Sequence, residues 1–216
     1  NIPLNSQTYH DGIEQFSGNL DILLDQYKKQ GIPVLISTLA SNEVDQPPFT
    51  SSDGELGANS FYAKGKQLLM QRKHKQAQKA FIEASDRDLL RFRAPSQFNH
   101  IIKSKVDNNN VHLVDVQKKI RDDSKNGVIG FQHMYEHLHP NARGYFLLAE
   151  AFVDKIISNQ FINDLTVPYP ANLAWQDVPL TNVDLIAADF KIKTLVSDYP
   201  FKAQKQAVTF GSANTA

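Results

Sequence analysis

The sequence feature that most restricts the fold is an amphipathic segment followed by a glycine and a short apolar run. Between residues 11 and 29, apolar side chains recur at three- and four-residue spacing, which predicts a helix that ends at Gly31. The run IPVLISTLA at 32–40 is rich in branched residues and has little polar alternation. Such a strand is typical of a parallel sheet that helices cover on both faces. We therefore expect an α/β fold.

Three further helices separate this strand from a second one, and the last lies within 86–105, where Pro95 is expected to break or start a helix. Residues 60–86 predict a helix pair that resembles a single tetratricopeptide unit, which we interpret as an insertion packed on the main domain. Small residues allow its two helices to approach closely, namely Gly65, Ala77 and Ala84. The run VHLVDV at 111–116 then predicts a second strand, with Asp115 near its carboxyl end.

The patterns divide the chain into four parts. Residues 1–59 hold a helix, a strand and a loop of the α/β domain, and residues 60–106 form the helical insertion. Residues 107–160 carry the second strand, a histidine-rich loop and a long helix. The remaining part, 161–216, is rich in proline at its start and predicts an extended wrap, a helix capped by Thr181 and a tail with one strand at 207–210.

Composition limits the classes of function. The chain has 216 residues, 41% hydrophobic and 21% charged, with a formal net charge of zero. A neutral chain is not a general binder of nucleic acid or of anionic membranes. It lacks an apolar run long enough to span a membrane. Cysteine is absent, so the redox compartment is not readable, and we lean toward an extracytoplasmic or cell-envelope location.

The segment with the richest chemistry is FQHMYEHLHPNARGYFLLAEAFVDKI, residues 131–156. Three histidines lie within seven positions, namely His133, His137 and His139. Glu136 stands three residues before the last of them, and Asn141 can cap the long helix that follows. A loop that leads into a helix N-terminus is exposed but rigidly anchored, and such loops often carry function.

Glu136 and His139 have the spacing of a carboxylate that orients a general base. The carboxylate can accept a hydrogen bond from one ring nitrogen, while the other nitrogen takes and returns a proton. His137 directly follows Glu136 in the sequence, and we expect its ring to point away from the carboxylate. Two alternatives stay open here: a zinc site built from the histidines, and a solvated cluster without a role.

Three further residues are candidates for substrate binding. Asn42 and Asp45 follow the first strand, and in open parallel sheets ligands bind at the carboxyl ends of the strands. They belong either to such a pocket or to a solvated loop. Arg93 can hold a substrate carboxylate or phosphate, or it can pair with an internal acid, Asp86 or Asp88. We favour the internal pairing for this arginine.

The segment EHLHPNARGYFLLAEAF resembles the last block of the SGNH, or GDSL-type, serine hydrolases, in which Asp-x-x-His-Pro precedes the C-terminal helix. Glu136 matches the acid and His139 the base. One branch of that family has a similar order of motifs, matched here by Thr38, Asn42, Asp45, Pro48, Phe49, Asp86, Arg87, Asp88, Arg91, Phe92, Arg93, Ala94 and Asp115. The resemblance implies a three-layer, flavodoxin-like parallel sheet and hydrolysis of a small-molecule or glycan ester. It implies no cofactor and no metal.

The sequence departs from that family in two respects. Glutamate replaces the family's aspartate at position 136, and no Gly-Asp-Ser block, which carries the nucleophile on the first strand, precedes residue 11. We therefore expect the C-terminal portion of such a hydrolase, inactive alone, which pairs with an N-terminal half of the same protein or with itself at an open sheet edge. Ser212 in VTFGSANTA resembles a nucleophile turn only weakly. The alternative is a non-catalytic module that binds a protein or glycan through 60–86 and 161–180.

Overall fold

The computed structural model describes residues 1–162 and 170–208, which belong to two compact units, Asn1–Asn163 and Asp164–Ala216. Each unit is described by itself. Residues 1–162 contain both strands, the helical insertion and the histidine-rich loop. None of the helices in the described ranges is both long and apolar enough to cross a membrane.

The first helix and strand form where the sequence predicts them, but the helix starts earlier and the strand is shorter than the apolar run at 32–40. Helix α1 spans Gln7–Lys29, so it begins before residue 11, because the side chain of Ser6 accepts a hydrogen bond from the backbone of Tyr9 at 3.2 Å and caps it. Gly31 adopts a left-handed conformation after the helix, with φ of 65°. Strand β1 then spans Val34–Ser37.

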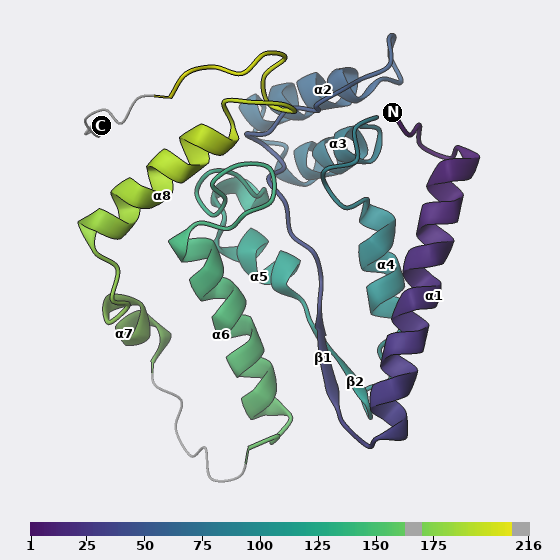
Figure 1. The fold of residues 1–216 in the computed structure, drawn as a ribbon, viewed down its shortest axis with the longest axis vertical. Coiled ribbons are helices and arrows are strands. Elements are labelled where there is room, and N and C mark those ends of the chain that lie inside the picture. The colour runs from purple at the N-terminus through teal and green to yellow at the C-terminus, as the bar shows by residue number, and fades with distance from the viewer. Residues whose placement is uncertain (163–169, 209–216) are drawn as a thin grey trace. The chain divides into compact units, whose positions relative to one another are not determined.

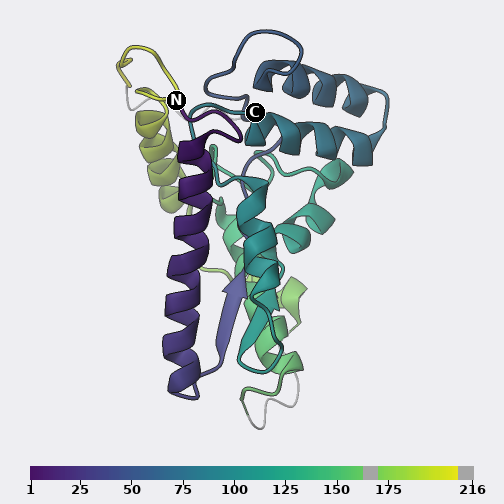
Figure 2. The same ribbon diagram turned by 90° about the vertical axis from the view of Figure 1, so that its right-hand side faces the viewer.

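The described part of the sheet has two parallel strands. Strand β2 spans Val111–Val114 and pairs with β1 in register, Val34 opposite Val111 and Ser37 opposite Val114. Helices lie on both faces: α1 and α4 (Ser96–Ser104) on one side, α5 (Val116–Asp123) and α6 (Ala142–Ser158) on the other (Figure 1). Figure 2, turned to face the first pair, shows β1 between α1 and α4. This arrangement confirms the α/β class.

The main core lies between the sheet and the pair of helices α5 and α6. Its buried members come from β2, α5, the segment 129–134 and α6, namely Val114, Val116, Ile120, Ile129, Met134, Leu147 and Ala151. Leu35 of β1 packs against the same cluster. The burial of Met134 within the histidine-rich loop and of Ile129 just before it fixes this loop to the sheet, because removing such side chains from water stabilises the fold.

The helix pair that the sequence predicts within 60–86 is present. Helices α2 (Ala58–Met70) and α3 (His74–Asp86) are joined by a tight turn in which Arg72 has a positive φ of 56°. They pack closely because Gly65 faces the ring of Phe81, which is almost completely buried. Of the helix predicted within 86–105, only α4 forms, because Pro95 stands at its start, and residues 87–95 are not helical.

The second unit differs from the sequence prediction in its first half. Residues 171–176 form a short helix, α7 (Ala171–Gln176), instead of part of an extended wrap. The fixed φ of Pro170 suits the residue before a helix, which local apolar spacing did not reveal. Helix α8 (Asn182–Leu195) begins with the predicted capping box of Thr181 and Asp184. Of the strand expected at 207–210, positions 207 and 208 have no regular structure and the other two lie outside the described residues.

Candidate active site

The histidine-rich loop, residues 131–141, is closed on itself and joined to the start of α6. The backbone of Tyr135 donates to the carbonyl of His139 at 2.8 Å, and Asn141 donates to the carbonyl of His133 at 2.9 Å. The side chain of Asn141 accepts from the backbone of Gly144 at 3.0 Å and so caps α6, as predicted. The loop therefore holds its side chains on a rigid support.

The carboxylate of Glu136 is the centre of this loop. Its side chain is only 2% exposed, and its two oxygens accept backbone hydrogen bonds from His137 and His139, each at 2.7 Å. Nδ1 of His139 contacts Oε1 of Glu136, and Nδ1 of His137 contacts Oε2. A buried carboxylate with several donors is held in one orientation, because each lost bond would leave a charged oxygen unsatisfied.

The ring of His139 joins this buried carboxylate to the surface. Its side chain is 52% exposed, while its Nδ1 lies against Glu136. A carboxylate only accepts hydrogen bonds, so Nδ1 carries a proton and Nε2 of the neutral ring is left as the proton acceptor. Within residues 1–162 and 170–208, Nε2 of His139 has no hydrogen-bond partner. A general base with an orienting acid requires such a pair, with one ring nitrogen on a carboxylate and the other facing outward.

His137 contradicts the expectation that its ring points away from Glu136. The loop curls around the carboxylate, so that the next side chain folds back against the second oxygen. The ring is buried and lies edge-on to Phe49 and Phe92, with centroids 5.4 Å and 6.1 Å away. Burial, together with the charges of His139 and Arg93, lowers the pKa of His137 to about 4. At neutral pH this imidazole is uncharged.

His133 anchors the loop to the end of α5. The ring is completely buried, with Nε2 at 2.7 Å from an oxygen of Asp123 and Nδ1 at 3.2 Å from the hydroxyl of Ser124. The rings of His133 and His137 are thus directed at different partners. Among the described residues, no group of three or more His, Cys, Asp or Glu side chains has the geometry to hold a metal ion.

Two of the candidate binding residues, Asn42 and Arg93, support the histidine-rich loop at His137. Arg93 pairs with Asp88 at 3.3 Å, both side chains being 3% exposed, which confirms the internal pairing. It also donates to the carbonyls of Asn42 and Gln46, each at 3.0 Å. Asn42, completely buried, donates its backbone N–H to the carbonyl of His137 at 2.9 Å. Both residues brace the loop, and a contact with substrate stays a prediction for each of them.

Asp45, the third candidate, lies at the other end of the histidine-rich loop. It accepts a hydrogen bond from the backbone of Phe131 at 2.8 Å and donates its own backbone N–H to the side chain of Asn42 at 2.9 Å.

Glu43, which the sequence analysis missed, accepts from the backbone of Ile129 at 3.0 Å and pairs with Arg121. Burial raises the pKa of Glu43 despite that pairing. In the sequence it stands among turn-forming residues, which gave no sign that it is buried.

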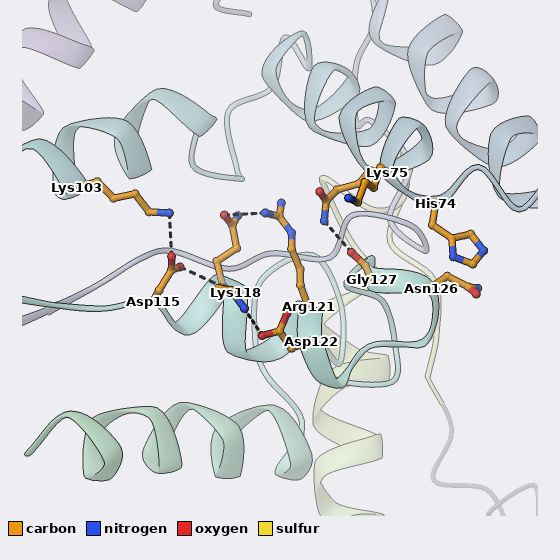
Figure 3. Close-up of a pocket in the computed structure, with 11 residues that line it drawn as sticks. His74, Lys75, Lys103, Asp115, Lys118, Arg121, Asp122, Asn126 and Gly127 are labelled. Atoms are coloured by element: carbon orange, nitrogen blue, oxygen red, sulfur yellow. Dashed lines mark hydrogen bonds and ion pairs between the residues drawn. The ribbon is translucent and has the colours of Figure 1, made fainter. Parts of the chain in front are cut away.

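A polar cleft of about 400 Å³ lies elsewhere, along α5 (Figure 3). Asp115 lines it and accepts from Lys103 at 2.9 Å, from the hydroxyl of Thr38 at 2.9 Å and from the backbone of Lys118 at 3.2 Å. Burial would raise the pKa of Asp115, but the bonds from Lys103 and Thr38 outweigh it and lower the value. Lys118 pairs with Asp122 in the same cleft, and His139 does not line it. Lys103 and Lys118 are each paired with an acid of the cleft, and Arg121 is paired with Glu43. Because His139 does not line this cleft, we do not place the site there.

Neither the known protein families, nor the curated proteins, nor the solved structures contain a match to this chain.

Proposed function

We propose that this chain carries the base and the acid of a serine hydrolase of the SGNH type that cleaves acyl esters. His139 is the base, Glu136 orients it, and the two-stranded sheet belongs to the three-layer parallel sheet of that family. The observation that carries the proposal is a half-exposed imidazole whose Nδ1 contacts a carboxylate that is 2% exposed. A surface histidine without a role has no need of a buried charge beneath it, which is costly to bury.

The chemistry follows from the two ring nitrogens. A serine hydroxyl bound to Nε2 of His139 transfers its proton there as its oxygen attacks the ester carbonyl carbon. Glu136 stabilises the imidazolium that forms, because the two opposite charges are in contact. The same proton then passes to the oxygen of the leaving alcohol. Proton transfer by a positioned base of this kind contributes about 100- to 10,000-fold to a rate.

The proposal assigns the attacking hydroxyl to a serine outside the described residues. Within 1–162 and 170–208, no serine or threonine hydroxyl is hydrogen-bonded to His139. Ser212, the weak candidate from the sequence, lies outside these ranges. Both strands have one edge without a strand neighbour among the described residues, and such an edge can accept a further strand that brings the nucleophile. Residues 1–216 alone are expected to be nearly inert.

The test is the hydrolysis of a short-chain p-nitrophenyl ester by the complete gene product. We expect His139→Ala to lower kcat/KM by about 100-fold or more. His100→Ala is the matched control, because its ring is exposed and faces only the side chain of Gln97, at 3.5 Å. A fluorophosphonate probe followed by mass spectrometry identifies the serine, and its labelling is expected to fall in the His139 variant alone.

Two results would contradict the proposal. If His139→Ala retains full turnover, His139 is not the base. If the complete gene product neither hydrolyses the ester nor reacts with the probe, the chain has no such activity. Capture of a protein or glycan that depends on residues 60–86 then favours the non-catalytic binding module.

A further inference from the structure

A small cavity of about 170 Å³ lies between the first half of α1 and the segment that leads into α4. Figure 2 shows these two helices running beside one another. Most of the lining is apolar, contributed by Ile2, Tyr9, Ile13, Ala94, Pro95 and Phe98. Two arginines, Arg91 and Arg93, line the same cavity. An apolar cavity with a few converging polar groups is the usual form of a small-molecule site.

Each of these arginines has one buried side-chain nitrogen that finds no acceptor among the described residues. Arg91 donates from Nε to the carbonyl of Ile2 at 3.0 Å and from Nη1 to the carbonyl of Asp86 at 2.5 Å, which leaves Nη2. Arg93 uses both terminal nitrogens on the loop after β1 and on Asp88, which leaves Nε. Arg93 is only 5% exposed, so solvent does not readily satisfy that N–H.

The neighbouring carboxylates do not supply the missing acceptors. Asp88 accepts from the backbone of Phe49 at 2.8 Å and of Thr50 at 3.0 Å, and Asp86 accepts from the backbone of Ser96 at 2.7 Å. Burial lowers the pKa of both arginines, although a guanidinium stays charged at any physiological pH. Two charged donors thus lie at the wall of an apolar cavity with unused hydrogen-bonding capacity, which is costly to leave unmet.

We propose that this cavity binds a small carboxylate that carries a short apolar chain. One carboxylate oxygen accepts from Nη2 of Arg91 and the other from Nε of Arg93, while the chain contacts Ile13 and Phe98. An engineered cavity of about 150 Å³ holds benzene, so a ligand of about six heavy atoms fits. Butyrate has this size and chemistry. The site requires neither His139 nor Glu136, so it is independent of the proposed hydrolase activity.

The experiment is a calorimetric titration of the intact chain with sodium butyrate, with butyramide as the neutral isostere at equal ionic strength. We expect saturable binding of butyrate in the millimolar range, as suits so small a ligand, and binding of butyramide at least about tenfold weaker. Arg91→Gln removes one donor and is expected to weaken butyrate binding at least about tenfold. His139→Ala is expected to leave it unchanged.

A pair of glycines in α1 supplies a matched control. At both Gly12 and Gly18 an added Cβ meets no heavy atom within 4 Å, but only Gly12 lines the cavity. Gly12→Leu and Gly18→Leu therefore improve helix propensity alike. The leucine at position 12 can turn into the apolar cavity and occupy the ligand's place. We expect Gly12→Leu to weaken butyrate binding at least about tenfold and Gly18→Leu to leave it within about twofold.

Three results would overturn the proposal: no saturable binding of butyrate, equal binding of butyramide, or equal affinity in the two glycine variants. Should Arg91→Gln fail to fold, the glycine pair decides alone. Loss of esterase activity in His139→Ala with butyrate binding intact separates this site from the proposed function.

Discussion

Replacing Glu136 with glutamine tests whether its carboxylate holds the histidine-rich loop together. The two oxygens of Glu136 accept backbone N–H groups from His137 and His139, each at 2.7 Å, in a site that is 2% exposed. Glutamine keeps the shape but offers one oxygen and one NH2 group, so one backbone donor then faces another donor. The loss of a charge-assisted hydrogen bond costs about 1.5–3 kcal/mol, and an unsatisfied buried N–H costs about 1–3 kcal/mol. We expect Glu136→Gln to lower the free energy of unfolding by about 3 kcal/mol.

Urea denaturation followed by circular dichroism measures this free energy. Glu83→Gln is the matched control, because the side chain of Glu83 is 48% exposed and its i,i+4 pairing with Arg87 is at the surface. Such a pair contributes about 0.5 kcal/mol or less. His139→Ala removes the ring donor but leaves the two backbone donors to Glu136, so it is expected to cost less than Glu136→Gln. A Glu136→Gln variant within about 0.5 kcal/mol of the parent would show that the carboxylate does not organise the loop, and Glu136 would lose its orienting role.

Two further predictions concern His137 and the helical insertion. Because burial and nearby positive charge lower the pKa of His137 from 6.5 to about 4, its stabilising effect is present above pH 6.5 and is lost as the pH falls toward 4. Between pH 7 and pH 5 this loss amounts to about 2 kcal/mol. Urea denaturation of His137→Gln should therefore show a free energy of unfolding that depends less steeply on pH. An equally steep dependence would refute the assignment. At Gly65 an added Cβ would lie 2.7–2.9 Å from the ring of Phe81. The cost of overpacking, about 1–3 kcal/mol, exceeds the gain in helix propensity, about 1 kcal/mol, so Gly65→Ala should lower the melting temperature. Phe81→Leu should cost less stability in the Gly65→Ala background than in the parent. A Gly65→Ala variant more stable than the parent would contradict the close packing.

The sequence alone determined most of the local elements and several of their caps. Apolar spacing located the two helices of the insertion, because neighbours three and four residues apart share one face of a helix. The caps at Asn141 and Thr181 were equally readable, since a cap joins a side chain to a backbone N–H only a few residues away. The contact between Glu136 and His139 is equally local, because the two residues are only three positions apart in a short loop.

Only the tertiary structure decided which polar groups are buried and what they contact. Arg93 meets the carbonyl of Asn42 from 51 positions away, and Glu43 meets the backbone of Ile129 from 86 positions away. Neither pairing leaves a trace in local spacing, because it arises when the loop after β1 folds against the histidine-rich loop. The fold of the histidine-rich loop turned His137 back onto Glu136. The packing of α1 beside α4 placed two arginines from one short segment at the wall of an apolar cavity. Burial is a property of the assembled fold, and with it come the pKa of His137 and the unmet donors of Arg91 and Arg93.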